Sequence, residues 1–194
     1  MAGHLLPPRA PGGPCPFSGC ANATEHTYYA CPEHLRSVYG LEIRRSSLPG
    51  AGLGLFAARP FRKWETLCRF GGEVITMERL NQRMRNPTAN TAPYAIRLPG
   101  RDGMVRDEFR YRSPAAFSND SINPLLLYAL VVIDGEKWGD AYQRACRRAP
   151  ANALATGDTC LVASKKIPAG AEVTWHYGSS YWRGHNIIDE ILPD

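Results

Sequence analysis

The stretch LPGAGLGLFAARPF, residues 48–61, has glycine at positions 50, 52 and 54 and then turns apolar. Glycine-rich loops often cradle phosphates, but a dinucleotide fingerprint needs the spacing G-x-G-x-x-G and a helix directly after it. Here the spacing is G-x-G-x-G, and Pro60 lies where that helix would grow. Two interpretations remain open from these residues alone. The stretch is either a glycine-rich β-turn or a loop whose bare backbone is approached by a ligand other than a phosphate.

The composition is that of an ordinary soluble protein. The 194 residues suffice for one domain and an appendage. The net charge of +5 favours acidic partners, although the one dense basic cluster, Arg144, Arg147 and Arg148, is typical of a solvated helix face. We expect no signal peptide and no membrane span, because the longest apolar run, PLLLYALVVI at 124–133, is shorter than the ~20 residues that a bilayer requires.

Short runs separated by turn residues predict a mostly-β domain. The strand patterns are LEIRRS, GLGLFAA, TLCRFGGEVI, YAIRLPG, GMVRD, CLVASKKI and AEVTWHYG. The apolar run at 124–133 is expected to be a further, buried strand. Helical patterns are few, and we expect helices at 77–85 and 136–148.

Three segments lie in order along the chain: GAGLGLFAARPFRKWETLCRFGGEVI at 50–75, SPAAFSNDSINP at 113–124, and CLVASKKIPAGAEVTWHYGSSYW at 160–182. Together they resemble the SET-domain family of protein lysine methyltransferases. That family has a Gly-x-Gly-Leu-Phe-Ala segment, a Tyr/Phe-x-Gly-Glu segment, an Asn-His-Ser-Cys-x-Pro segment and a Gly-x-Glu-(Leu/Val)-Thr-x-x-Tyr-Gly segment. The resemblance covers about residues 40–182. It implies a mostly-β SET fold of several small curved sheets, with few short helices and a knot-like C-terminal segment.

The resemblance also implies that the glycine loop binds S-adenosylmethionine, which is a sulfonium and not a phosphate. The residues implied to contact it are Ala51, Gly52, Leu53, Gly54, Tyr94, Asn119 and Asp120. Tyr177 matches the active-site tyrosine, whose hydroxyl orients the substrate amine. Phe70, Trp175 and Tyr181 are implied to line the channel for the substrate lysine.

The match has departures. Asp120 stands at the family's usual histidine, so a negative charge is expected near a cationic cofactor. Trp175 stands where phenylalanine or tyrosine is usual, and it either narrows the channel or tilts out of it. The family's cysteine-rich segment after Tyr177 is missing, so the C-terminal wall of the channel is expected to come from the residues that follow this tyrosine. The long connection at 134–158 has no assigned role.

The N-terminal segment CPFSGCANATEHTYYACPEH carries Cys15, Cys20, Cys31 and His34, with His26 in reserve. Two close ligands, a gap and two more close ligands are typical of a tetrahedral, structural Zn²⁺ site. The alternative is free thiols on a mobile arm. The expected organisation is a disordered N-terminus at 1–14, a zinc-binding segment at 15–37, a SET domain at 38–182 and a C-terminal tail at 183–194.

We therefore expect an intracellular methyltransferase that uses S-adenosylmethionine to modify a protein lysine, in a histone tail and hence in the nucleus. A first alternative is a catalytically weak or inactive SET module that binds peptide. A second is a zinc-containing protein that binds nucleic acid, which the basic net charge would favour. Cofactor binding distinguishes the first two from the third, and turnover distinguishes the first from the second.

Overall fold

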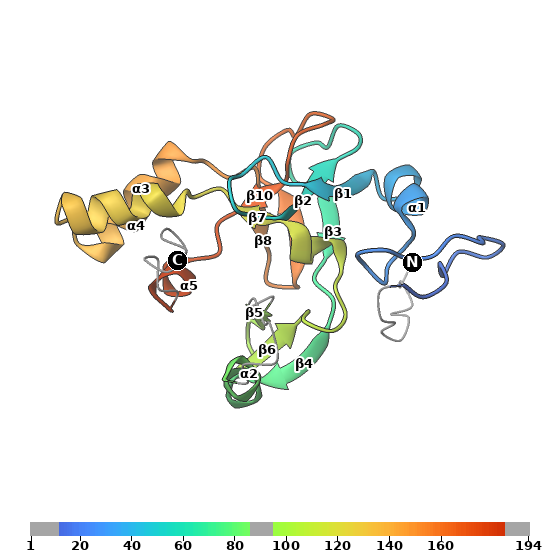
Figure 1. Ribbon diagram of the computed structural model, residues 1–194, viewed down its shortest axis with the longest axis horizontal. Coiled ribbons are helices and arrows are strands. Elements are labelled where there is room, and N and C mark those ends of the chain that lie inside the picture. Colours follow the sequence, from blue (N-terminus) through green and yellow to red (C-terminus); the bar gives the residue numbers. More distant parts are fainter. Residues whose placement is uncertain (1–11, 86–94, 185–194) are drawn as a thin grey trace.

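Several small sheets make up the protein, with helices at their margins (Figure 1). The computed structural model describes residues 12–85 and 95–184. The strands of this part are β1 (Leu41–Arg45), β2 (Leu53–Ala57), β3 (Thr66–Arg69), β4 (Glu73–Thr76), β5 (Ala95–Arg97), β6 (Met104–Asp107), β7 (Asn119–Asp120), β8 (Ala153–Ala155), β9 (Cys160–Ala163) and β10 (Thr174–Trp175). The helices are α1 (Pro32–Ser37), α2 (Met77–Met84), α3 (Pro124–Tyr128), α4 (Trp138–Arg148), α5 (Ser179–Gly184), the 3-10 helix η1 (Pro114–Phe117) and the π-helix η2 (Ala129–Ile133).

Hydrogen bonding groups the strands into pairs and three-stranded sheets. β1 pairs with β2, and the larger sheets have the orders β3-β9-β8 and β4-β6-β5, all antiparallel. β7 pairs with β10 in parallel, which brings Asn119 beside Thr174 and Asp120 beside Trp175. The predicted mostly-β class is confirmed. The parallel pair joins two segments that are far apart in the sequence and that carry predicted site residues.

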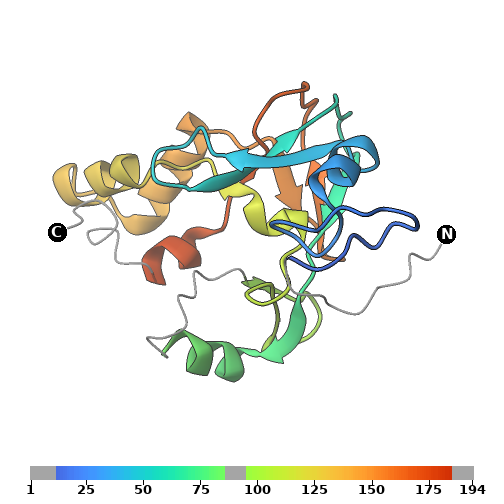
Figure 2. The same cartoon turned by 45° about the vertical axis from the view of Figure 1, so that its right-hand side comes forward.

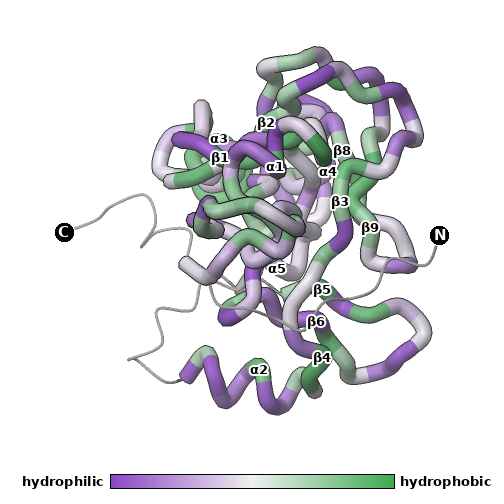
Figure 3. The backbone as a smooth tube through the Cα atoms, turned by 90° about the vertical axis from the view of Figure 1, so that its right-hand side faces the viewer, coloured by the Kyte–Doolittle hydropathy of each residue, from purple (hydrophilic) through white to green (hydrophobic). Residues whose placement is uncertain are grey.

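The first hydrophobic core lies among β1, β2, β3, β8 and β9. Its fully buried side chains include Leu41, Leu55, Leu161 and Ile167. All four residues of β9 are buried, which requires that both faces of its sheet are covered. The helix α2 differs, because hydrophilic and hydrophobic residues alternate along it in Figure 3 and Leu80 is its buried residue.

A second hydrophobic core lies in the segment inserted between β7 and β8. Here α3, η2 and α4 pack together to one side of the sheets, with α5 next to them (Figure 2). The buried members of this core are Ile122, Leu127, Leu130, Ala141, Tyr142, Ala145 and Trp182. Because Trp182 belongs to α5, the C-terminal helix packs directly against the insertion.

The prediction of a buried strand at 124–133 is wrong, since these residues form α3 and η2. The side-chain oxygen of Asn123 accepts from a backbone amide of the first turn at 2.9 Å, and Pro124 occupies the start of the helix. Both are strong helix-start signals. Leu127 and Leu130 are buried at a spacing of three, which is the pattern of a helix with one apolar face.

The helices predicted at 77–85 and 136–148 are confirmed as α2 and α4. The Thr76 hydroxyl accepts from the Arg79 amide and caps α2, as expected for threonine at that position. Among the described residues, no helix has the length and apolar character that would let it cross a membrane.

Candidate active site and metal centre

The glycine loop is the connection between β1 and β2, residues 46–52. Gly50 and Gly52 have φ angles of +75° and +68°, in the left-handed region that glycine adopts without strain. A Cβ built on Gly52 would meet no heavy atom within 4 Å. The backbone here therefore borders open space, which is what a closely approaching ligand needs.

Glu172 ties this loop to the segment before β10. Its carboxylate accepts from the Ser46 hydroxyl at 2.6 Å, from the Ser47 amide at 2.8 Å and from the Ser47 hydroxyl. A Cβ on Gly54 would collide with the same carboxylate, so a larger residue here would displace Glu172 from its hydrogen bonds. Partial burial acts to raise the pKa of Glu172, but hydrogen bonds from Ser46, Ser47 and Asn119 outweigh it and hold the pKa below its usual value.

Two consecutive residues, Ser118 and Asn119, connect the loop to the predicted catalytic tyrosine. The Asn119 side-chain amide donates to the carbonyl of Leu53 at 3.1 Å. The buried Ser118 carbonyl accepts from the Tyr177 hydroxyl at 3.0 Å and from the Trp175 indole N–H at 3.1 Å. The loop and the tyrosine are thus attached to two consecutive residues at the start of β7.

Trp175 and Tyr177 line a cavity of about 540 Å³. Its aromatic wall runs from Phe70 through Trp175 and Tyr177 to Tyr181, with successive ring centroids 5.4, 5.3 and 4.7 Å apart. The rest of the wall is mostly aliphatic and comes from α2, β5, β6 and η1. Such a cavity suits an apolar side chain and disfavours a charge inside it.

Asp120 is buried, and both carboxylate oxygens are used within the protein. Oδ1 accepts from the Ile122 amide at 2.9 Å and lies 3.3 Å from Nδ1 of His176. Oδ2 accepts from the Tyr177 amide at 2.8 Å and from the Trp182 indole N–H at 2.9 Å. The carboxylate expected beside the cofactor therefore holds the backbone of Tyr177 and the helix α5.

A second buried carboxyl, that of Glu108, also borders the cavity. Its Oε1 accepts from the Gly71 amide at 2.5 Å and from the Ser113 amide at 3.0 Å. Its Oε2 has no hydrogen-bond partner. Burial raises the pKa of Glu108 to about 7, against the lowering effect of hydrogen bonding to the Ser113 side chain and to the Gly71 and Ser113 amides and of the nearby Arg106 charge.

Cys15, Cys20, Cys31 and His34 come together, and their ligand atoms all lie within 4.8 Å of one another. The sulfurs of Cys20 and Cys31 are 3.9 Å apart, and His34 Nδ1 lies 3.5 Å from Cys15 Sγ and 3.2 Å from Cys31 Sγ. Tetrahedral zinc, with bonds of ~2.3 Å to sulfur and ~2.0 Å to nitrogen, separates such ligands by about 3.8 and 3.6 Å. The four residues could therefore hold one metal ion with little movement.

The cysteine segment is packed on the rest of the domain. Leu35 of α1 belongs to the first core, and the His34 ring stacks on Phe17 with centroids 4.2 Å apart. Burial acts to raise the pKa of the Cys31 thiol, but hydrogen bonds from His34 outweigh it and lower the pKa. A lowered pKa favours the thiolate, which is the form that binds metals.

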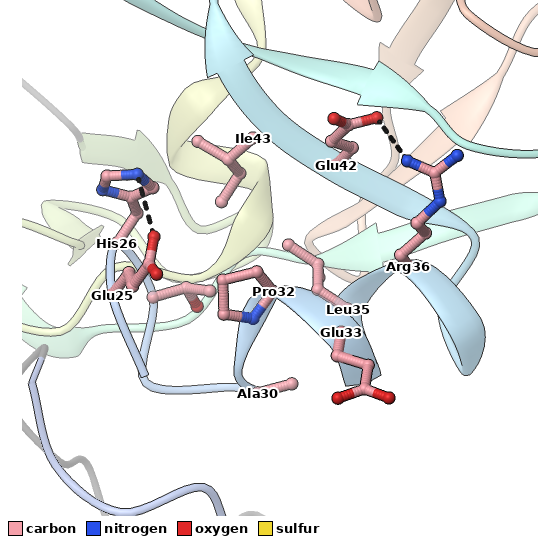
Figure 4. A pocket seen from close by; sticks show the side chains of 10 residues that line it. Glu25, His26, Ala30, Pro32, Glu33, Leu35, Arg36, Glu42 and Ile43 are labelled. Atoms are coloured by element: carbon pink, nitrogen blue, oxygen red, sulfur yellow. Dashed lines mark hydrogen bonds and ion pairs between the residues drawn. The ribbon is translucent and has the colours of Figure 1, made fainter. Parts of the chain in front are cut away.

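His26, the reserve ligand, lies outside the cluster. Its ring pairs with Glu25 at 3.8 Å and lines a smaller hollow of about 260 Å³ beside α1 and β1 (Figure 4). Apolar side chains, including Pro32, Leu35 and Ile43, lie in the middle of this hollow.

The SET-domain family model matches residues 52–178, which is more than half of the chain. The protein belongs to the SET-domain family. The matched range begins at Gly52 in the glycine loop and contains the Ser118–Asn119 connection and Tyr177, whereas the cysteine segment precedes it. No curated protein matches the sequence significantly.

Solved structures share this SET fold at low sequence identity. A crystal structure of an active polycomb repressive complex 2 in the stimulated state matches with a TM-score of 0.51 at 20% identity, covering 71% of this chain and 15% of that chain. The Chaetomium thermophilum complex, in an autoinhibited conformation bound to S-adenosylmethionine, matches with a TM-score of 0.53 at 19% identity, covering 78% and 16%. This chain thus spans about a sixth of the chains it matches, and the likeness shows the fold alone.

The SET resemblance and the fold class predicted from the sequence are confirmed, and the predicted site residues fall into two groups. The turn and its support contain Ala51, Gly52, Leu53, Gly54 and Asn119. The wall of the cavity contains Phe70, Trp175, Tyr177 and Tyr181. Asp120 lies between the groups, and Tyr94 lies outside the described residues. The roles of these residues remain predictions.

Sequence reasoning missed the groups that hold the site together. Glu172 stands in the Gly-x-Glu segment of the SET pattern, so its motif position was a usable signal. Ser118 acts through its main-chain carbonyl, which no side-chain pattern reveals. Trp182 was expected to contribute to the C-terminal wall, but its hydrogen bond to Asp120, 62 residues away, was not foreseen because that contact depends on the fold.

Proposed function

We propose that this protein transfers a methyl group from S-adenosylmethionine to a lysine of a protein substrate, in a histone tail. One observation carries the proposal: the segment that holds the glycine loop also holds Tyr177 on the wall of an apolar cavity. A cofactor site and a substrate site attached to two consecutive residues suit transfer between two bound molecules, because the reacting atoms must be aligned.

The glycine loop fits S-adenosylmethionine through its exposed backbone. The space beside Gly52 is open, and the side chain of Leu53 is 37% exposed. Ala51, Gly52 and Leu53 would hold the cofactor. The Asn119 side chain would hold the loop in place by its hydrogen bond to the Leu53 carbonyl. When bound, the cofactor supplies a methyl group on a positively charged sulfur.

The cavity prepares the substrate amine. A free lysine has a pKa of ~10.4, so its amine is mostly protonated and cannot attack. The aromatic and aliphatic part of the wall disfavours the charged form and so favours the neutral nucleophile, provided that the Glu108 carboxyl that borders the cavity is protonated. Because the Tyr177 hydroxyl donates to the Ser118 carbonyl, its oxygen can act as an acceptor toward an amine N–H or toward polarised methyl hydrogens.

The histone substrate is supported by likeness in fold. A structure of the Chaetomium thermophilum complex with methylated and substituted forms of histone H3 matches with a TM-score of 0.51 at 20% identity. A histone substrate would place the protein in the nucleus. The zinc assignment is supported by the ligand spacing of the Cys₃His cluster, whose thiolate and imidazole ligands suit that metal.

The test uses labelled S-adenosylmethionine with core histones and a cell extract, and mass spectrometry to locate the acceptor. Tyr177→Phe keeps the ring and removes the hydroxyl, so we expect transfer to fall ~100- to 1000-fold while the cofactor still raises the melting temperature. Tyr39→Phe, which removes a phenol packed beside Phe17, is the control and should keep the wild-type rate.

The outcomes separate the alternatives. Stabilisation by the cofactor without transfer to any protein would favour the inactive module over the enzyme. No stabilisation at millimolar cofactor would refute the enzyme and the inactive module together. Near wild-type turnover by Tyr177→Phe would refute the assignment of this tyrosine.

A further inference from the structure

The helix α5 packs on the insertion between β7 and β8 through Trp182. The helix α5 has six residues, Ser179–Gly184, which is too short to be stable alone in water. Its Trp182 is only 5% exposed because the side chain enters the second core among α3, η2 and α4. The position of α5 is therefore set by what Trp182 packs against.

Polar contacts fix the same helix. The Trp182 indole N–H donates to Asp120 Oδ2 at 2.9 Å, and this oxygen also accepts from the Tyr177 amide. The Arg183 guanidinium lies over the Trp138 ring of α4, 6.0 Å from its centroid. One face of α5 is thus bound to the insertion, and its central indole is bound to the strand that precedes the insertion.

The neighbouring residue, Tyr181, faces the cavity. Its ring packs edge-on against Tyr177 with centroids 4.7 Å apart and against Trp182 with centroids 5.2 Å apart. Because Tyr181 and Trp182 are consecutive on a short helix, a displacement of the buried indole moves the cavity wall as well.

We infer that the insertion supports the C-terminal wall of the substrate cavity, and that Trp182 is the positioning residue that connects the two. Tyr181 is the side chain that touches the substrate lysine, whereas α3, η2 and α4 act through their packing on α5, chiefly on Trp182. The substrate half of this inference rests on the proposed function. The docking of α5 on the insertion does not.

The inference predicts a selective kinetic effect. Trp182→Phe keeps an aromatic ring in the second core but removes the N–H that Asp120 accepts. We expect KM for the peptide substrate to rise by about tenfold or more, as for loss of a hydrogen bond to a charged group. KM for S-adenosylmethionine should stay within about twofold, because Glu172 and Asn119 hold the glycine loop independently of α5.

A matched pair of core variants distinguishes a specific effect on the cavity wall from a general loss of protein stability. Leu130→Ala removes a side chain that is 1% exposed in the second core, and Ile167→Ala removes one that is 0% exposed in the first core. Neither residue lines the cavity. We expect Leu130→Ala to raise the peptide KM and Ile167→Ala to leave it near wild type, although both lower the melting temperature. Equal rises in KM would overturn the inference.

Hydrogen exchange of the Trp182 indole N–H, followed by NMR, tests the docking without turnover. We expect slow exchange in the wild type and in Ile167→Ala, and exchange at least ~10-fold faster in Leu130→Ala, since its packing surface is lost. Fast exchange in the wild type would overturn the docking itself. If no protein is methylated but the exchange pattern holds, the proposed function fails and the docking stands.

Discussion

Replacing Glu108 with glutamine removes a carboxyl that is 0% exposed and whose pKa burial raises to about 7. Glutamine has nearly the same shape, and it keeps a carbonyl oxygen for the amides of Gly71 and Ser113 that Oε1 now accepts. The substitution therefore removes mainly the buried charge. We expect Glu108→Gln to gain stability relative to the wild type as the pH rises through neutrality.

The size of the effect follows from the difference in pKa between the two states. An ordinary glutamate has a pKa of 4.5, whereas Glu108 has a pKa of about 7 in the fold. Between these values the folded protein holds a proton that the unfolded chain has released, so the free energy of unfolding falls as the pH rises. The stability is fully present below about pH 4.5 and is lost as the pH passes through about 7. At ~1.36 kcal/mol per pKa unit, the loss totals about 3 kcal/mol.

The assay is urea unfolding of both proteins at about pH 5.5 and pH 8, between which about 2 kcal/mol of that loss occurs. We expect the stability difference to move by this amount in favour of Glu108→Gln. Comparing the two proteins at each pH cancels the protonation of the cysteine cluster, which is common to both. Glu78→Gln, which removes an exposed carboxylate on α2, is the control for the loss of one acidic side chain. A difference that does not depend on pH would refute the argument from a buried charge.

The remaining predictions concern the cofactor, the metal and the product. Gly52→Val and Gly135→Val impose the same strain of ~1–2 kcal/mol, because the two φ angles are +68° and +67° and both positions border open space. Only Gly52→Val should lose stabilisation by S-adenosylmethionine in a thermal-shift assay. Loss of stabilisation in both variants would show that the loop is not part of the cofactor site. Elemental analysis should find about one zinc per chain in the wild type and none in Cys31→Ser or His34→Ala. Both variants should melt at a lower temperature than the wild type, because the same segment contributes to the first core. Metal-free wild-type protein from a chelator-free purification would contradict this. Trp175→Phe should keep most of the rate and add more methyl groups to one peptide, as measured by mass spectrometry, and an unchanged product would show that the indole does not limit the cavity.

Local pattern was enough to predict most of the sheets. The GLGLFAA stretch predicted β2 because it follows a glycine turn and continues as a short apolar run. The pairing of β7 with β10 was not predictable in this way, since two residues carry no periodicity. That pair follows from the SET pattern as a whole, in which the order of distant segments is the signal.

The apolar run at 124–133 shows where hydrophobic patterning fails to distinguish a strand from a helix. A continuous apolar run is compatible with a buried strand and with a buried helix, and composition does not separate them. The decisive signal was the Asn-Pro step at its start, because Asn123 caps the helix and Pro124 is tolerated in a first turn. The prediction of a strand rested on the apolar run alone and did not take the Asn123-Pro124 sequence into account.

The residues of the candidate site also divide into those that a sequence motif marks and those that only the fold brings together. Tyr177 and the glycine loop were predicted because a motif marks them. Glu108 was not predicted, because a carboxyl with one unpartnered buried oxygen is defined by its surroundings and not by its neighbours in the chain. Its importance depends on residues from two other segments, Gly71 and Ser113, whose amides face it only in the fold.

Two departures from the SET pattern that looked independent in the sequence are connected in the structure. Asp120 stands at the position of a histidine, and residues 178–194 contain no cysteine. The carboxylate accepts from the Trp182 indole, and Trp182 anchors the helix that stands where the family's cysteine-rich segment would follow. Because imidazole has one acceptor nitrogen at most, it could not accept the Tyr177 amide and the indole N–H together with a third donor, as the two oxygens of Asp120 do. The aspartate and the tryptophan-anchored helix are therefore one structural change, and replacing either alone should disturb the same wall of the cavity.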